Sequence, residues 1–243
     1  MTNPKLSNIL RSPKQKIASF IHFAKAKFRQ EKLKEVKKLE PYILKNSVIF
    51  DIGAQFGQYS KQFSKIHQGS CIIYAFEPFQ YSRNILKKVI QGKKNIKIFS
   101  NAFGNKIYES SINIPIKESG KLGPGLAHIG KEEKRDFVQQ KINVQTIDSF
   151  ILNENIVNLS FIKIDIEGAE ILVFEGAQQT IKNFRPAIKC EIDENLIKRF
   201  DKKPEDIFKF FKNFNYKFYI LNKDFQEVSG YSVPSDYLFL PQK

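Results

Sequence analysis

The chain has 243 residues, enough for one domain with a substantial core, and 42% of them are hydrophobic. Its two cysteines, Cys71 and Cys190, lie in apolar segments that we predict to be strands, which excludes a disulfide framework or a thiolate zinc site. No apolar run is long enough to span a membrane, and the N-terminus lacks the apolar region of a signal peptide. We therefore expect a cytoplasmic protein.

The net charge of +15 is concentrated at the N-terminus, where residues 1–46 hold 12 Lys or Arg against 3 Glu. We predict a basic helix over residues 13–40 with one apolar stripe. The stripe consists of Ile17, Phe20, Ile21, Ala24 and Phe28. We expect it to pack on the domain; weak contact with an anionic membrane surface, an acidic carrier or nucleic acid is the alternative. The predicted division is a basic N-terminal helical extension, residues 1–46, and one domain, residues 47–243.

The first strand of the domain runs directly into a glycine turn and a helix. Gly53 and Gly57 permit a tight turn with positive φ. A dinucleotide-binding turn reads G-x-G-x-x-G, but here Gln55 and Gln58 stand where a pyrophosphate needs bare backbone. This disfavours NAD and favours a cofactor without a pyrophosphate, such as S-adenosylmethionine, whose amino group Asp51 could meet.

The second predicted strand ends in Glu77, twenty residues past Gly57. An acid at this distance and at a strand end can bind both hydroxyls of a ribose. Strands and helices alternate through most of the chain, which predicts a doubly wound α/β architecture. We expect strands at 48–53, 71–77, 96–102, 159–166 and 187–192, and helices at 57–67, 80–91, 169–183 and from Pro204 onward.

The pattern changes between residues 109 and 145, where two short strands at 111–116 and 137–144 flank a glycine-rich loop, 119–130. Such insertions commonly carry substrate contacts. His128 in this loop is a candidate general base, because imidazole titrates near neutral pH. The last two strands, 216–221 and 237–240, have no room for a crossover helix between them, so we expect them to pair antiparallel.

Two predicted strands carry charged residues where central strands are usually apolar. Strand alternation places Lys163, Asp165 and Glu167 on one face of the first, and Lys189 and Glu191 on one face of the second. Buried ionised side chains are costly unless they are paired or serve a site. Lysine–carboxylate pairing is one explanation. The other is a ligand site, because Asp165 and Glu167 approach the carboxyl end of the sheet, where open α/β sheets bind ligands.

Five segments together resemble the FkbM family of S-adenosylmethionine-dependent methyltransferases. They are DIGAQFGQYS, YAFEPF, SNAFGN, VQTIDSFI and FIKIDIEGAEILVFEGA, spread over about residues 47 to 192, and IDIEGAE is the most specific. The resemblance implies a Rossmann-like doubly wound sheet of seven strands with a reversed C-terminal hairpin. It also implies methylation of a hydroxyl on a small molecule or on a sugar or polysaccharide precursor.

The resemblance also implies which residues form the site. Predicted cofactor-binding residues are Asp51, Gly53, Gln55, Gly57 and Tyr59 at the first turn, Glu77 at the ribose, Asn101 and Ala102 at the adenine, and Asp165 beside the methyl group. We predict Asp165 as the general base or as the group that orients it, with Glu167 and His128 as the other catalytic candidates. Glu191 and Lys163 are predicted to bind substrate. Asp165, Glu167 and Glu191 could also bind Mg²⁺, although two carboxylates from one strand do not establish a metal site.

Two other classes of protein stay open at this stage. Nucleic-acid methyltransferases that act on base amines usually carry an N/D-P-P-[FY] turn where this chain has the carboxylates of Asp165 and Glu167, which repel phosphate. Only 6 of the 40 basic residues are arginine, which also argues against a specific nucleic-acid partner. A non-catalytic cofactor-binding protein is the second class, because a fold does not by itself establish activity.

Overall fold

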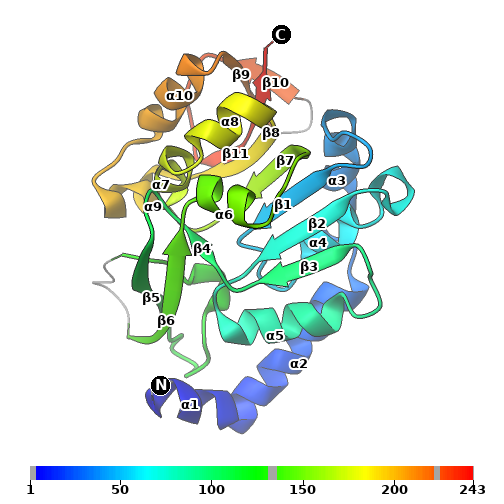
Figure 1. Ribbon diagram of the computed structural model, residues 1–243. Coiled ribbons are helices and arrows are strands. Elements are labelled where there is room, and N and C mark those ends of the chain that lie inside the picture. The colour runs from blue at the N-terminus through cyan, green and yellow to red at the C-terminus, as the bar shows by residue number, and fades with distance from the viewer. Residues whose placement is uncertain (1–3, 131–135, 222–224, 243) are drawn as a thin grey trace.

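The computed structural model describes residues 4–130, 136–221 and 225–242, and a mixed β-sheet forms its centre (Figure 1). Five strands are parallel: β1 (Val48–Ile52), β2 (Ile72–Phe76), β3 (Ile96–Phe99), β7 (Leu159–Ile164) and β8 (Ala187–Ile192). Three are antiparallel: β9 (Tyr216–Leu221), β10 (Phe225–Val228) and β11 (Ser235–Pro241). Their order is β10-β9-β11-β8-β7-β1-β2-β3. The predicted α/β sheet with a reversed C-terminal hairpin is confirmed, and β10 adds an edge strand to the seven expected.

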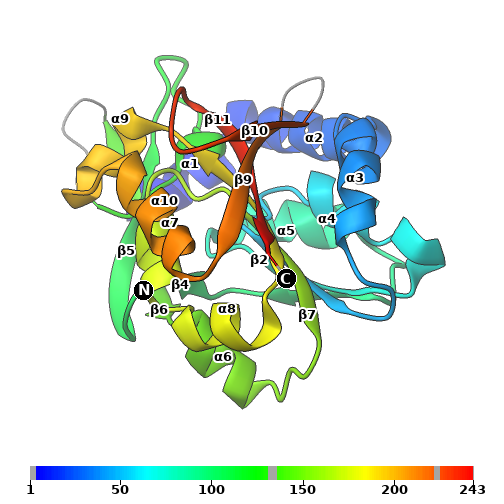
Figure 2. The same ribbon diagram turned by 90° about the horizontal axis from the view of Figure 1, so that it is seen from above.

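Helices cover both faces of this sheet (Figure 2). On one face, side chains such as Ile49 and Ile73 pack against α3 (Leu33–Leu39) and α4 (Gln58–Phe63). On the other face, Phe50 and Ile162 belong to a larger core that is closed by four helices. These are α6 (Ile147–Asn153), α7 (Glu170–Glu175), α8 (Gln178–Phe184) and α10 (Pro204–Asn213). The alternation of apolar residues along each strand thus yields three layers.

Two further helices and four 3₁₀ turns belong to this part of the fold. They are α5 (Gln80–Val89), α9 (Glu194–Ile197) and the 3₁₀ turns η1 (Glu40–Tyr42), η2 (Ile66–Gly69), η3 (Pro124–Leu126) and η4 (Lys198–Phe200). The predicted helix over 169–183 is wrong in one respect, because it is divided at Gly176. A Cβ at Gly176 would lie 2.1 Å from the carbonyl oxygen of Gly104, so glycine is required where the two segments meet.

The insertion forms a small separate sheet of β4 (Ala102–Phe103), β5 (Tyr108–Pro115) and β6 (Phe137–Gln145), in the order β4-β6-β5. The predicted strand 96–102 is therefore divided, with its end in this second sheet. The glycine-rich loop returns to β5, where the backbones of Asn113 and His128 exchange hydrogen bonds of 2.8 and 3.0 Å. This pairing brings His128 back beside the main sheet.

The N-terminal segment forms three helices, so the prediction of one helix over 13–40 is wrong. They are α1 (Pro4–Arg11), α2 (Pro13–Phe28) and α3. Ser12 caps α2 by accepting a hydrogen bond from the Gln15 amide, and the chain becomes extended at Arg29. Lys61 then donates hydrogen bonds of 2.6 to 3.0 Å to three carbonyl oxygens at the end of α2, those of Ala26, Lys27 and Arg29. These carbonyls are satisfied by a lysine rather than by a further helical turn.

The apolar stripe of α2 does not pack on the domain, so that expectation is also wrong. Its large members are exposed, with relative exposures of 60% for Ile17, 70% for Phe20, 41% for Ile21 and 75% for Phe28, and Ala24 is partly exposed. The face that meets the domain instead carries smaller or polar side chains, including Gln15, Ala18 and Ala26. Small side chains let α2 lie close to α5, which leaves the apolar stripe facing outward.

Candidate active site

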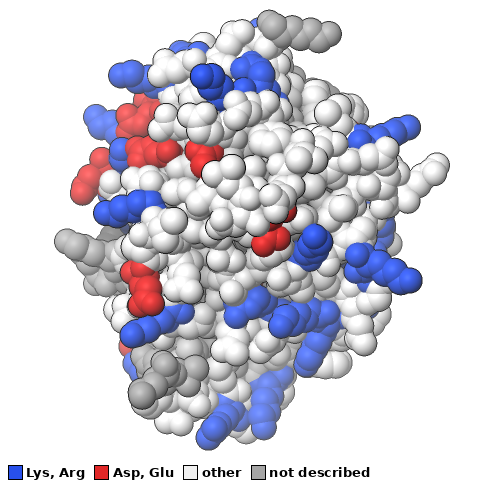
Figure 3. Space-filling model, viewed as in Figure 1, with Lys and Arg blue, Asp and Glu red and all other residues white. Residues whose placement is uncertain are grey.

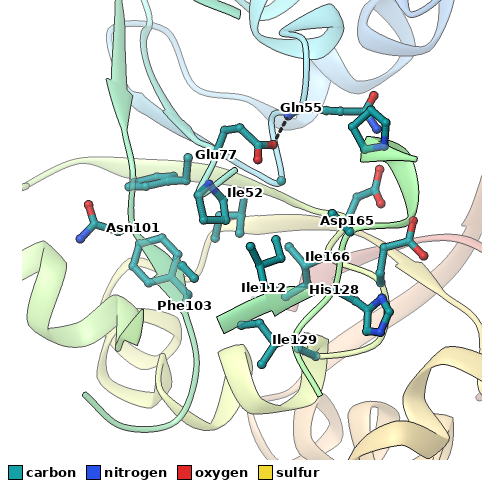
Figure 4. A pocket seen from close by; sticks show the side chains of 18 of the residues that line it. Ile52, Gln55, Glu77, Asn101, Phe103, Ile112, His128, Ile129, Asp165 and Ile166 are labelled. Atoms are coloured by element: carbon teal, nitrogen blue, oxygen red, sulfur yellow. Dashed lines mark hydrogen bonds between the residues drawn. The ribbon is translucent and has the colours of Figure 1, made fainter. Parts of the chain in front are cut away.

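A pocket lies at the carboxyl ends of β1, β2 and β7, beneath the loop that carries His128 (Figure 4). Eight of the predicted site residues line it: Gly53, Gln55, Glu77, Asn101, Ala102, His128, Asp165 and Glu167. In Figure 4, Asn101 and Phe103 lie on one side of the pocket, whereas Asp165 and His128 lie on the other. The pocket thus has an apolar end and an acidic end.

The glycine turn has the backbone that the sequence predicts. Gly53 and Gly57 have φ values of +74° and +82°. A Cβ on Gly53 would lie 1.9 Å from the carbonyl oxygen of Asp165, so glycine is what lets the ends of β1 and β7 approach each other. Gln55 extends toward the loop, where a Cβ on Gly125 would lie 3.1 Å from its Nε2. The turn and the loop therefore meet over the pocket.

Glu77 is held at the end of β2 by two backbone amides. Its Oε2 accepts a hydrogen bond of 2.8 Å from Gln55 N, and its Oε1 accepts one of 2.8 Å from Phe79 N. Burial raises the pKa of Glu77 to about 7, although these two hydrogen bonds oppose the shift. Each carboxylate oxygen keeps a second lone pair for another donor. The geometry suits a ligand with two neighbouring hydroxyls.

Asp51, Gly57 and Tyr59 lie behind the pocket rather than in its lining. Asp51 is fully buried and accepts a hydrogen bond of 2.5 Å from the Ser60 hydroxyl. Tyr59 donates one of 2.5 Å to Glu35, and Gly57 begins α4. These three residues therefore lie outside the pocket lining, where they shape the turn.

Two buried lysines stand side by side on neighbouring strands, because Lys163 of β7 is in register with Lys189 of β8. Lys163 Nζ donates a hydrogen bond of 2.9 Å to Gly53 O and lies 3.4 Å from Asp51 and 3.5 Å from Asp165. The pairing explanation therefore holds for Lys163, which is 1% exposed and lies outside the lining. The predicted role of Lys163 in substrate binding does not match this placement.

Lys189 is paired on the other side of the same layer. Its Nζ lies 2.5 Å from Asp236 of β11 and 3.4 Å from Glu35 of α3. The Tyr59 ring lies over both ammonium groups, with its centroid 5.1 Å from Lys163 Nζ and 5.0 Å from Lys189 Nζ. Carboxylates and an aromatic face thus offset the repulsion between the two cations.

The carboxyl groups of Asp165 and Glu191 lie at the ends of the neighbouring strands β7 and β8, where each alters the pKa of the other. Burial alone would raise the pKa of Asp165, but the charges of Lys163 and Lys189 lower it below its usual value. Burial and the Asp165 charge raise the pKa of Glu191 to about 7. Asp165 therefore stays ionised at neutral pH, and Glu191 takes up a proton more readily than an ordinary glutamate.

The turn after β7 carries two further acids, Glu167 in the pocket lining and Glu170 in the protein interior. β7 ends at Ile164, earlier than predicted, and Glu167 lines the pocket with a φ of +63°. Burial and the charges of Asp165 and Glu191 raise the pKa of Glu167 to about 8. Glu170 is buried and accepts hydrogen bonds from the Ile166 and Gly168 amides, at 3.3 and 3.1 Å. Glu170 thus fixes the turn, a role that was not predicted from the sequence.

His128 lies 1% exposed in the pocket lining, so it is not a solvent-exposed loop residue. Its Nδ1 is 2.9 Å from the carbonyl oxygen of Leu126. Because a carbonyl only accepts hydrogen bonds, Nδ1 carries a proton, and Nε2 is the basic nitrogen of the neutral ring. His128 is therefore placed as a second candidate base.

The sequence analysis overlooked the apolar walls of the pocket. They include Phe76, Phe103, Ile112, Ala127 and Ile129. Nothing in a single sequence distinguishes a strand residue that faces a pocket from one that faces the core. The one available signal was the position of Ala127 and Ile129 beside His128 in a glycine-rich loop.

Among residues 4–130, 136–221 and 225–242, no group of three or more His, Cys, Asp or Glu side chains is arranged to hold a metal ion. Within the same described ranges, no helix has the length and apolar character needed to cross a membrane.

The strand order, the glycine turn and the acid after β2 together define a Rossmann-like methyltransferase fold. The family model described as Methyltransferase FkbM domain matches residues 51–218. The chain therefore belongs to the FkbM family of S-adenosylmethionine-dependent methyltransferases, as the resemblance predicted.

Solved structures of several methyltransferases are similar to this chain. The methyltransferase FkbM from Methylobacillus flagellatus KT is 14% identical with a TM-score of 0.47. The alignment covers 97% of this chain and spans 58% of the length of the Methylobacillus protein. A putative rRNA-methylase from Clostridium thermocellum is 6% identical with a TM-score of 0.48 and coverages of 86% and 93%. The precorrin-6y C5,15-methyltransferase from Geobacter metallireducens GS-15 is 10% identical with a TM-score of 0.47 and coverages of 88% and 89%. No curated protein matches the sequence.

Proposed function

We propose that this protein transfers a methyl group from S-adenosylmethionine to a hydroxyl of a small molecule or of a sugar or polysaccharide precursor. The observation that carries the proposal is Asp165, a carboxylate at the pocket edge that buried lysines keep ionised. An ionised acceptor of protons next to a cofactor pocket suits an O–H group, which must lose its proton as the methyl group arrives.

The lining residues fit S-adenosylmethionine, which supplies an electrophilic methyl group on a sulfonium. Glu77 would accept hydrogen bonds from the ribose hydroxyls through its remaining lone pairs. Phe103 and Ile112 would flank the adenine, with Asn101 and Ala102 at its edge. Gly53 and Gln55 would lie along the methionine end, and Asp51 would act on this end indirectly, through the position of the turn.

The residues of the acidic end would divide the work. Asp165 would align the acceptor hydroxyl by accepting its hydrogen bond and then take its proton. Alignment is the larger contribution, since proximity supplies about 7–11 kcal/mol against about 10²- to 10⁴-fold for a general base. Glu191 would donate a hydrogen bond to Asp165 and so hold it in orientation, and Glu167 would contact the substrate. His128 is the alternative base.

The acidic edge argues against a nucleic-acid substrate. Asp165 lines the pocket where the acceptor must enter, and its ionised carboxylate would repel a phosphate backbone there.

The proposal is tested by binding and turnover. S-adenosylhomocysteine should bind the full chain in calorimetry, and methyl-labelled S-adenosylmethionine should label at least one member of a panel of sugars, nucleotide sugars and hydroxylated small molecules. Deoxy analogues of the labelled acceptor serve as matched controls and should stay unlabelled. Failure to bind either cofactor form, or labelling of RNA alone, would refute the proposal.

A further inference from the structure

The outward face of α2 combines bulky apolar side chains with flanking positive charge. Ile17, Phe20, Ile21 and Phe28 recur at the spacing of a single helical face, and all four are exposed. Exposed apolar side chains elsewhere on the chain, such as Leu152 and Val157, do not form such a row along a helix. A contiguous exposed apolar face of this kind marks an interaction surface.

The segment that carries this face is basic. Residues 4–30 contain seven Lys or Arg residues and neither Asp nor Glu: Lys5, Arg11, Lys14, Lys16, Lys25, Lys27 and Arg29. Lys16 and Lys25 lie on opposite sides of the apolar row at 100° per residue, and both are exposed. In Figure 3, Lys and Arg gather over the lower part of the molecule, where Figure 1 shows α1, α2 and α5, while Asp and Glu gather at the upper left.

The inward face of α2 is held firmly, so its orientation is fixed. Gln15 accepts a hydrogen bond of 3.0 Å from the buried Leu122 amide. His22 stacks on Phe56 with ring centroids 4.7 Å apart and contacts the Tyr81 hydroxyl at 3.0 Å. Lys61 holds the C-terminal end. Turning the apolar row inward would break all of these contacts.

We propose that α2 binds the surface of an anionic phospholipid bilayer, lying in the interface with Phe20 and Phe28 inserted. A helix with aromatic and aliphatic side chains on one face and lysines beside them is the type that lies in the interface without spanning the membrane. Its lysines are complementary to anionic headgroups. Because the inward face contacts the glycine turn at Phe56 and the pocket loop at Leu122, this surface would place the pocket close to the bilayer.

The chief rival occupant is a second copy of the chain. Two copies meeting through this face would bring the exposed Lys16 and Lys25 of one copy toward those of the other, and the nearby acids Asp136 and Glu31 already pair with Lys5 and Arg29. Charge complementarity therefore favours anionic lipid over self-association.

Sedimentation with vesicles tests the proposal on the full chain. The protein should bind vesicles of equimolar phosphatidylcholine and phosphatidylglycerol, bind phosphatidylcholine alone far less, and be released by high salt. The double substitution Phe20→Ser and Phe28→Ser should lower the partition coefficient at least about tenfold, because two exposed aromatic side chains lose their insertion. Replacing Lys16 and Lys25 by Gln should weaken binding to the anionic vesicles only.

The matched control is the double substitution Leu152→Ser and Val157→Ser, which removes two equally exposed apolar side chains far from the row and should leave partitioning unchanged. Cofactor binding should be normal in every variant, which separates this inference from the proposed function. Absence of binding to anionic vesicles would overturn the inference. A dimer of the native chain in solution that the Phe20→Ser, Phe28→Ser variant abolishes would overturn it in favour of self-association.

Discussion

The two acids that flank the pocket, Glu77 after β2 and Asp165 after β7, are held in different ways. Backbone amides hold Glu77, with one hydrogen bond to each carboxylate oxygen. Side-chain charges and a second carboxyl group hold Asp165. Backbone hydrogen bonds fix a direction, which suits binding, whereas ion pairs fix a charge, which suits proton transfer. Each end of the pocket is therefore built for one of the two tasks, and substitutions at each end test this division.

The largest effect should follow from removing the charge that supports the Asp165 end. Asp51 is fully buried, and Lys163→Met would remove the buried cation beside it. Removal of one partner of a buried ion pair destabilises proteins by about 3–5 kcal/mol. Urea unfolding should show a loss of this size for Lys163→Met. The exposed Lys182→Met on α8 is the matched control and should change the free energy of unfolding by less than about 0.5 kcal/mol.

A small effect of Lys163→Met on unfolding would mean that Asp51 relaxes or takes up a proton at little cost. In that case the charge of Asp165 could not be attributed to a rigid layer of buried lysines.

The next effect concerns turnover. Asp165→Asn should lower kcat by about 10²-fold or more, because the amide keeps the shape of the side chain but does not take a proton. The affinity for S-adenosylhomocysteine should change much less. Glu191→Gln is the matched variant: an amide can still donate to Asp165, so it should lower kcat far less.

His128→Ala distinguishes the alternative base. If Asp165→Asn turns over almost normally while His128→Ala loses about 10²-fold, the proton goes to the imidazole and Asp165 serves only as a partner of Lys163.

The contrast between the two ends was only partly predictable from the sequence. Strand ends and a glycine turn fix Glu77 and Gly53, because both features depend on local pattern. The partner of Lys189 was not predictable, since Asp236 and Glu35 are far away in the chain and meet it only through the antiparallel return of β11 and the docking of α3.

The direction of the α2 stripe was missed for a related reason. Apolar periodicity identifies a face but does not say whether the domain or the solvent receives it. Contacts of Gln15 and Lys61 with distant segments decide that orientation. Asp51 shows the same limit: its place at a strand end was visible, but its burial under Ser60 was not.

At the other end of the pocket, Glu77→Ala should weaken binding of S-adenosylhomocysteine by about 1.5–3 kcal/mol, the range for hydrogen bonds to a charged group. Calorimetry measures this loss directly. With saturating cofactor, kcat should stay within a few-fold of the native value, opposite to Asp165→Asn. The exposed Glu109→Ala on β5 is the control. If Glu77→Ala left affinity intact and reduced kcat, the proposed division of tasks would be reversed.

The smallest effect is the pH dependence of stability in the protein without cofactor. Four acids have a folded-state pKa raised from 4.5: Glu77, Glu170 and Glu191 to about 7, and Glu167 to about 8. Because burial raises these values, the folded state binds more protons than the unfolded state above pH 4.5. Their stabilising contribution is complete below pH 4.5 and is lost as the pH rises through 7 to 8.

His22 acts in the opposite direction below pH 6.5, because burial and nearby lysines lower its pKa. The melting temperature should therefore fall as the pH rises from about 5 to about 8, with His22 reducing the slope below pH 6.5, as scanning fluorimetry can measure. Glu170→Gln keeps a side-chain oxygen for the Ile166 and Gly168 amides but cannot ionise, so it should flatten this fall, whereas Glu109→Gln should not. A melting temperature that rises across this window would show that the turn after β7 holds its carboxylates charged. Glu167, Glu170 and Glu191 would then be negatively charged in addition to Asp165. In that case only its position, and not its charge, would distinguish Asp165 as the acid that accepts the proton.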